Sequence, residues 1–252
     1  MLTNTTIDKL RDMNMRVMAD KFMGQLTNPD LSNLSFEERF GLIVDAEFAS
    51  RKSKRLTRLI KSAGYAYSNA CLEDIEYHPD RKLDKSAIAR LGTCNYVREH
   101  HNIIILGATG SGKTYLSNAF GIAANRDFMS VKYIRLPELL AELALSRVEG
   151  NYRKVFKQYR NVNLLILDEW LLFQLKDNEA RDVLEIAEAR YQKGSTIFCS
   201  QFNVAGWHQK LGDSTIADAI CDRIAHDSYV IMIDGADSMR KRKGIKEKGK
   251  GI

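Results

Sequence analysis

Residues 107 to 114 read Gly-Ala-Thr-Gly-Ser-Gly-Lys-Thr and match the pattern G-x-x-x-x-G-K-[ST] without a departure. The apolar run Asn102–Leu106 precedes them, and a stretch with helical character, Tyr115–Asn125, follows. A strand, a glycine-rich turn and a helix in this order are the context in which the pattern forms a phosphate-binding loop. Backbone N–H groups and the N-terminus of the helix then face a polyphosphate. The predicted nucleotide contacts are Gly107, Ala108, Thr109, Gly110, Ser111, Gly112, Lys113, Thr114 and Tyr115.

Two acids complete the chemistry that this loop predicts. We expect Lys113 to reach the β- and γ-phosphates of ATP and the Thr114 hydroxyl to bind Mg²⁺. Four apolar residues, Leu164–Leu167, lead directly into Asp168 and Glu169, as in a buried strand that ends at the ligand-binding edge of a parallel sheet. Asp168 is the expected second Mg²⁺ residue. Glu169 is the expected group that activates the attacking water, which favours hydrolysis over phosphate transfer to a small molecule.

Two further polar residues are candidates for the same reaction. Gln201 follows the predicted strand Ser195–Ser200 and could orient the water, although a polar residue that merely ends a strand explains it equally well. Arg223 ends a helical pattern that begins at Ile216, and it could reach the ATP of a neighbouring subunit. From the residues alone, a surface ion pair between Arg223 and Asp222 is the simpler interpretation.

Net charge and its distribution indicate a partner. The chain has 252 residues and a net charge of +6, and residues 240–252 alone carry seven basic side chains and one acid. The rest of the chain is therefore neutral overall. Local basic clusters within a balanced chain are the usual footprint of nucleic-acid binding.

The first basic cluster lies on one face of a predicted helix, with no acid between residues 51 and 61. A solvated face normally mixes both signs of charge, so we expect contact with phosphate backbones here. This cluster comprises Arg51, Lys54, Arg55, Arg58 and Lys61. A second cluster, between the second and third predicted strands, comprises Arg147, Arg153, Lys154, Lys157 and Arg160. No base-reading motif accompanies either cluster, which predicts binding with little sequence preference and a steep salt dependence.

The chain divides into segments of different character. Residues 1–65 show helical periodicity, and Ser35 with Glu38 forms a capping-box pattern that opens a helix with Phe36, Phe40, Ile43, Val44 and Phe48 on one side. Residues 66–100 are expected to be a linker packed on the core. Residues 101–239 alternate short apolar strands with helices, which indicates an α/β fold with a parallel sheet. Residues 240–252 are expected to be a disordered tail.

Cellular location follows from what the sequence lacks. The N-terminus reads as polar with no secretory signal, and the apolar runs fall short of the roughly 20 residues that span a bilayer. Cys71, Cys94, Cys199 and Cys221 stand far apart, as reduced thiols do rather than a disulfide or zinc framework. We expect a cytoplasmic protein.

Taken together, these residues resemble the AAA+ ATPases, and more closely the IstB-like transposition helpers, which are relatives of the DnaC helicase loader. The resemblance covers nearly the whole chain. The phosphate loop and the acidic strand are common to P-loop NTPases, whereas Trp207, Asp222-Arg223 and Ser238-Met239-Arg240 are the positions that narrow the match. Residues 101–239 are then the AAA+ ATPase domain.

The resemblance implies a five-stranded parallel sheet in the order 5-1-4-3-2, with Gln201 at the sensor-1 position and Arg223 as the arginine finger. It implies ATP and Mg²⁺ as cofactors, a homo-oligomer with composite ATP sites, assembly on double-stranded DNA and delivery of a transposase to its target. Many AAA+ proteins carry Asn at sensor 1. Only 18 residues follow Asp234, too few for the usual helical lid, which helicase-loader relatives also lack.

Two other functions fit the same residues. A helicase loader would share the ATPase core, but it would prefer single strands and present an exposed apolar surface to a helicase. A nucleotide-dependent scaffold that hardly hydrolyses ATP would have no use for Glu169.

Overall fold

The structure is a computed structural model that describes residues 2–31, 33–212, 214–235 and 238–243. It divides into two compact units, Met1–Arg58 and Leu59–Ile252. The predicted disordered tail lies outside the described residues from residue 244 onward. Its first four residues, 240–243, belong instead to a short helix, α12 (Met239–Lys243). Within the described ranges, no helix is both long and apolar enough to cross a membrane.

The first unit is helical, as predicted. It contains α1 (Leu2–Asp12), α2 (Arg16–Thr27), a 3-10 turn (η1, Pro29–Leu31) and the beginning of α3 (Phe36–Ala63), a helix that continues into the second unit. The expected capping box is present where α3 starts: the Ser35 backbone N–H donates to Glu38 Oε2 at 2.8 Å, and the Glu38 N–H donates to Ser35 Oγ at 3.2 Å. The start of α3 is therefore determined locally.

The apolar side of α3 is less buried than its pattern suggests. Ile43 is buried, but Phe36, Phe40, Val44 and Phe48 have exposed fractions of 72%, 50%, 39% and 59%. The rings of Phe36 and Phe40 stack with centroids 5.9 Å apart. These four residues follow one another at intervals of four, so they form one stripe along the helix. We call it the aromatic stripe.

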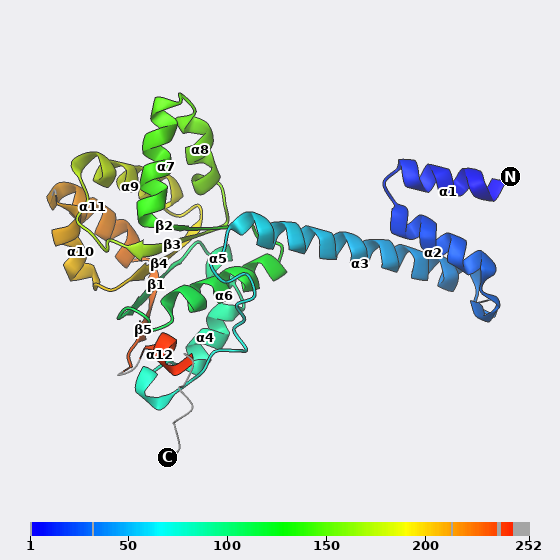
Figure 1. The fold of residues 1–252 in the computed structure, drawn as a ribbon, viewed down its shortest axis with the longest axis horizontal. Coiled ribbons are helices and arrows are strands. Elements are labelled where there is room, and N and C mark those ends of the chain that lie inside the picture. The colour runs from blue at the N-terminus through cyan, green and yellow to red at the C-terminus, as the bar shows by residue number, and fades with distance from the viewer. Residues whose placement is uncertain (1, 32, 213, 236–237, 244–252) are drawn as a thin grey trace, which may run out of the picture. The chain divides into compact units, whose positions relative to one another are not determined.

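The second unit is built on a parallel sheet of five strands (Figure 1). The strands are β1 (Asn102–Gly107), β2 (Val131–Arg135), β3 (Leu164–Trp170), β4 (Ser195–Ser200) and β5 (Ser228–Ile233). Their order is β2-β3-β4-β1-β5, and every neighbouring pair is parallel. This is the predicted order 5-1-4-3-2 read from the other edge, so the fold prediction is confirmed.

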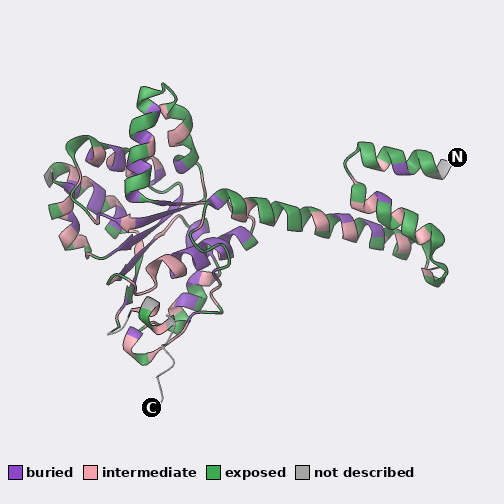
Figure 2. Ribbon diagram, viewed as in Figure 1, coloured by how far each residue is buried: buried purple, intermediate pink, exposed green. Residues whose placement is uncertain are grey.

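Helices cover both faces of this sheet (Figures 1 and 2), because the strands are apolar on both sides. Ile103 and Ile105 point into one core with α4 (Lys85–Gly92), α5 (Asn95–Arg98) and α6 (Lys113–Arg126). Ile104 and Leu106 point into the other. That second core is closed by α7 (Leu136–Val148), α8 (Tyr152–Arg160), α9 (Asp177–Arg190), α10 (Val204–Leu211) and α11 (Ser214–Ala225).

Residues 66–100 join the first of these two cores. Ile75, Ile88 and Leu91 are buried against β1 and α6, with a 3-10 turn (η2, Pro79–Arg81) between them. Because β1, β3 and β4 are parallel, their carboxyl ends meet at one edge of the sheet. The phosphate loop and Gln201 follow the ends of β1 and β4, and the two acids lie in the last three residues of β3.

Candidate nucleotide site

The phosphate loop connects β1 to α6, as its sequence predicts. Gly110 has φ +78°, and a Cβ there would lie 2.8 Å from Ser238 Cβ, so only glycine fits. Lys113 Nζ donates to the carbonyl oxygens of Gly107 at 2.7 Å and Ala108 at 2.9 Å. Its ammonium is thus already turned back over the loop, where a polyphosphate would lie. Burial lowers the pKa of Lys113, and the negative charge of Asp168 partly opposes this effect.

Thr114 and Asp168 meet as a pair of oxygen ligands. The Thr114 hydroxyl donates to Asp168 Oδ2 at 2.7 Å, and Asp168 is 5% exposed. The backbone N–H of Glu169 donates to the other oxygen, Oδ1, at 2.9 Å. A hydroxyl and a carboxylate on neighbouring elements are the donors that Mg²⁺ prefers. The residues present therefore fit the predicted metal.

Glu169 lies on an irregularity of the strand. The pairing of β3 with β4 shifts between Leu167 and Trp170, which marks a bulge. Within this bulge Glu169 has φ +54°, the left-handed region that non-glycine residues rarely adopt. The bulge sets the Glu169 side chain apart from the buried Asp168. Glu169 Oε1 lies 3.8 Å from a guanidinium nitrogen of Arg135, at the end of β2.

Strand β2 contacts the acids at a second point. The Tyr133 hydroxyl donates to Asp168 Oδ2 at 3.0 Å. Burial raises the pKa of the Tyr133 phenol, and the charge of Asp168 raises it further. Tyr133 therefore remains a proton donor throughout the neutral range.

A cavity of about 260 Å³ adjoins the phosphate loop. One wall comes from α6 and the loop, and the other from residues 67–83. Tyr67 and Tyr115 lie against each other with ring centroids 5.8 Å apart. The cavity is lined by Tyr67, Asp74, Ile75, Glu76, Arg81, Leu83, Gly110, Gly112, Lys113, Thr114, Tyr115, Leu116 and Met239.

Arg81 ties this second wall to the phosphate loop. Its buried guanidinium donates to the carbonyl oxygens of Glu76 at 2.6 Å and Ser111 at 2.9 Å. Burial is the main cause that lowers the pKa of Arg81. A charged group held by two carbonyls at this depth fixes the linker against the loop.

The C-terminal helix α12 closes the loop from another side. The Met239 N–H donates to the Gly110 carbonyl at 2.9 Å, and Arg242 pairs with Asp80. The side chain of Arg240, one of the positions that narrow the family match, lies outside the described residues.

Gln201 is exposed and lies directly after β4, next to the strand that ends in the acids. The preceding residue, Ser200, is buried and fixes this strand end. Its hydroxyl donates to the Trp170 carbonyl at 3.0 Å and accepts from Trp207 Nε1 at 3.2 Å. Trp207 therefore holds the backbone from which Gln201 projects, while the role of Gln201 itself stays a prediction.

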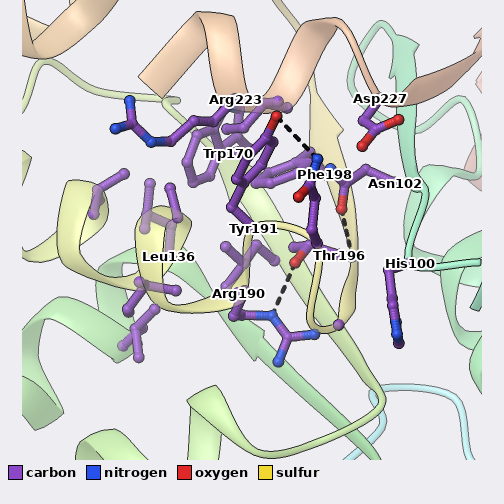
Figure 3. Close-up of a pocket in the computed structure, with 18 residues that line it drawn as sticks. His100, Asn102, Leu136, Trp170, Arg190, Tyr191, Thr196, Phe198, Arg223 and Asp227 are labelled. Carbon is purple, nitrogen blue, oxygen red and sulfur yellow. Dashed lines mark hydrogen bonds between the residues drawn. The ribbon is translucent and has the colours of Figure 1, made fainter. Parts of the chain in front are cut away.

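Arg223 lies on α11, which covers the face of the sheet opposite α6. Its partner is Glu188 on α9, at 3.0 Å, and a second nitrogen donates to the Ala219 carbonyl at 2.8 Å. The expected alternative partner was Asp222, but Asp222 contacts His226 at 3.2 Å. Arg223 lines a cavity of about 30 Å³, and Figure 3 shows Arg223 and the buried Arg190 on opposite sides of it. This cavity has room for about one water molecule, so it is no nucleotide site.

The first basic cluster lies on α3, and all five of its side chains are exposed. Arg51 is held within its own unit, because its guanidinium donates to Glu47 Oε1 at 2.7 Å and to the Asn14 carbonyl at 3.1 Å. The other four members are Lys54, Arg55, Arg58 and Lys61. They form the surface that we call the α3 basic face.

The second basic cluster is divided by the fold. Arg153, Lys154 and Lys157 are exposed on α8. Arg147, at the end of α7, instead makes a two-pronged contact with the buried Asp182 of α9 and stacks on the Tyr152 ring at 4.4 Å. Its part in DNA binding stays a prediction that this geometry does not favour.

Three residues of the site are not indicated by the sequence motifs: Arg81, Tyr133 and Arg135. Arg81 stands in a segment whose sequence predicts only a linker. Tyr133 and Arg135 had a usable signal, because they alternate on a predicted strand and one face of that strand ends beside the acids.

The family model described as "IstB-like ATP binding protein" matches residues 8–247. An insertion sequence ATP-binding protein of Sinorhizobium fredii is 38% identical over 241 residues, which cover 96% of this chain and 98% of the relative. The ATP-binding protein of an insertion sequence of Pseudomonas fluorescens is 39% identical over 201 residues, 80% of this chain and 87% of the relative.

Among solved structures, the DnaC helicase loader is similar with a TM-score of 0.56 and 22% identity, over 67% of this chain and 98% of that one. DnaA from Aquifex aeolicus, bound to an ATP analogue, is similar with a TM-score of 0.54 and 20% identity, over 68% of this chain and 52% of that one. At these identities the likeness concerns the fold.

Proposed function

The chain belongs to the family of IstB-like ATP binding proteins, and we propose that it is an ATPase that assembles on double-stranded DNA and assists a transposase. One observation carries the proposal of hydrolysis. The phosphate loop places Thr114 against Asp168 at 2.7 Å, and Glu169 follows on a bulge that sets it apart from Asp168. A metal carboxylate and a separate water-activating carboxylate are what hydrolysis requires.

In the proposed reaction each residue has one task. Lys113 moves from the carbonyls of its own loop to the phosphates. Thr114 and Asp168 would hold Mg²⁺, which would neutralise charge on the phosphate oxygens. Glu169 orients the attacking water and accepts its proton, with Gln201 on the adjacent strand as a second orienting group.

The nucleoside would occupy the 260 Å³ cavity beside the loop. Tyr67 and Tyr115 offer aromatic surface there, and ring contacts of this kind suit a planar base. Because Arg81 joins the linker wall to the loop, binding of the base and of the phosphates would be coupled.

From the position of Arg223 we propose that each ATP site is composite, formed by residues of two neighbouring subunits. Arg223 lies on the face of the sheet opposite α6, where it cannot serve as part of its own phosphate loop. An arginine from a neighbouring subunit would neutralise charge in the transition state. Assembly would then switch hydrolysis on.

DNA binding is proposed for the α3 basic face, together with Arg153, Lys154 and Lys157 on α8. These exposed cations carry long flexible side chains that suit phosphate oxygens rather than base edges. Binding of this type depends on the release of counterions and falls steeply with salt.

The transposase partner is proposed from the relatives, whose names place them in insertion sequences. The aromatic stripe on α3 supports a protein partner, since four exposed apolar side chains in a row are typical of docking surfaces. The same stripe favours a second candidate function, helicase loading, which requires such a surface.

One experiment tests the proposed function as a whole. The full chain is incubated with ATP and Mg²⁺, with duplex DNA, single-stranded DNA or neither, while phosphate release and particle size are measured. We expect duplex DNA to give oligomers and the fastest turnover. Turnover that responds to single strands alone would support the loader instead, and no turnover under any condition would contradict an ATPase. Co-purification with the transposase of the same insertion sequence, compared with a replicative helicase, then identifies the partner.

A further inference from the structure

Strand β2 places a tyrosine on the carboxylate of the proposed metal site. We propose that Tyr133 is a positioning residue of the Mg²⁺·ATP site, whose hydroxyl holds Asp168 in the orientation that binds the metal. This inference rests on the proposed ATPase function. It assigns a role to a residue that lies outside both nucleotide-binding motifs.

The geometry follows from the pairing of two strands. In the parallel register of β2 and β3, Tyr133 lies opposite Ile166 and Arg135 lies opposite Asp168. Tyr133 therefore starts two positions before Asp168, and its ring extends along the sheet. Its hydroxyl ends 3.0 Å from Asp168 Oδ2. A shorter side chain at position 133 would not span this distance.

Among the residues that the structure describes, three groups donate to Asp168, and they come from three elements. Thr114 and Tyr133 donate to Oδ2 at 2.7 Å and 3.0 Å, and the Glu169 N–H donates to Oδ1 at 2.9 Å. Thr114 has a second task, because its oxygen is also a proposed metal ligand. Tyr133 has no such task, so its hydrogen bond can persist when the metal binds.

A donor of this kind has a known physical effect. Hydrogen bonds to a metal-binding carboxylate fix its orientation and are worth about 10–100-fold in metal affinity. Asp168 is buried, so water cannot readily replace a missing donor.

Tyr133→Phe in the full chain removes the hydroxyl and keeps the ring. Binding of ATP that carries a fluorescent ribose label is titrated in EDTA and across a series of Mg²⁺ concentrations. We expect the Mg²⁺ concentration that gives half of the maximal gain in ATP affinity to rise about 10-fold. The affinity for ATP in EDTA should not change. Saturating Mg²⁺ should restore the parent turnover number, because the reacting groups themselves are intact.

Tyr159→Phe is the matched control. Tyr159 is buried and its hydroxyl donates to the Glu142 carboxylate, at the contact between α7 and α8 rather than at the site. The Tyr159→Phe variant loses the same kind of interaction, a hydrogen bond from a phenol to a carboxylate. It should leave the Mg²⁺ dependence of ATP binding unchanged.

Three results overturn the inference. They are an unchanged Mg²⁺ requirement in Tyr133→Phe, an equal loss of affinity in EDTA, and an equal shift in Tyr159→Phe. If the ATP affinity of the parent protein did not depend on Mg²⁺, the proposed ATPase site itself would be contradicted. Failure of the Tyr133 inference and failure of the proposed function are therefore distinguishable.

Discussion

The nucleotide site and the α3 basic face are both proposed to bind phosphates, yet they are built in opposite ways. At the nucleotide site Lys113, Thr114, Asp168 and Tyr133 are held by hydrogen bonds in a single arrangement. On α3 the members of the basic face are exposed to solvent. Fixed groups favour one geometry of one ligand, whereas flexible cations accept any phosphate backbone. Loss of one reacting group, such as Asp168, should therefore nearly abolish function in the first region, whereas loss of one cation should act gradually in the second.

The largest effect is expected from Arg223, which we propose that a neighbouring subunit supplies to the site. Arg223→Ala should lower ATP turnover by about 10³–10⁵-fold, because the transition-state charge loses its neutralising group. ATP binding by isolated subunits should not change. Turnover is measured as phosphate release on duplex DNA, and binding with labelled ATP.

Mixed assemblies provide the control for Arg223. Subunits with Arg223→Ala still hold an intact Glu169, and subunits with Glu169→Gln still hold an intact Arg223. A mixture should therefore regain part of the turnover that each variant lacks alone. Parent-level turnover of Arg223→Ala by itself would remove the composite site from the proposal.

Glu169→Gln should lower turnover by about 10²–10⁴-fold, the usual value of a general base. Because Asp168 and Thr114 keep their contact, ATP and DNA should still bind, and the complex on DNA should become long-lived. Turnover and dissociation from DNA are measured on the same sample. A variant that hydrolyses ATP at the parent rate would show that another group activates the water.

The basic face should respond gradually. Replacing Arg58 and Lys61 together with Gln should weaken duplex binding several-fold at moderate salt. The slope of log affinity against log salt should also fall by about 1 for each DNA phosphate that is no longer neutralised. Arg98→Gln is the matched control, since Arg98 is exposed but paired with Asp127 at 2.7 Å. An equal change in the control would mean that only net charge matters.

The smallest effect on DNA binding is expected from Arg147. This member of the second basic cluster is paired with Asp182 of its own chain. Arg147→Ala leaves the buried Asp182 without its partner and should cost about 1–3 kcal/mol of unfolding free energy. Urea unfolding measures this loss, and DNA affinity should stay near the parent value. A stable variant with weak DNA binding would reverse the assignment.

Much of the fold and half of the site could be predicted, because their signals are local. The phosphate loop and the acids are short motifs beside apolar strands, and the sheet order came with the family resemblance. Arg81 could not be assigned, since its partner Ser111 lies 30 positions away and meets it only after the linker has packed. Tyr133 was missed although its place on a predicted strand was a usable signal, because its partner Asp168 lies 35 positions away. Arg147 was predicted to bind DNA because other basic residues lie near it in the sequence. In the structure it pairs instead with Asp182 on another helix. The aromatic stripe has the periodicity of a buried side, but periodicity identifies a face and not what covers it.

The bulge in β3 limits how this protein can change in length. Strand side chains alternate with a period of two, so the deletion of one residue between Leu167 and Trp170 would restore regular pairing with β4. Because only Asp168 and Glu169 lie between Leu167 and Trp170, the deletion would keep Trp170 opposite Ser200 and in its aromatic contacts with Phe198 and Trp207, but it would remove one of the two acids. A substitution at this strand end can have a small or a large effect. Insertion or deletion of one residue changes the pairing with β4 in a single step. We therefore expect the spacing from Asp168 to Trp170 to tolerate neither insertion nor deletion, although the loop between α7 and α8 is open to both.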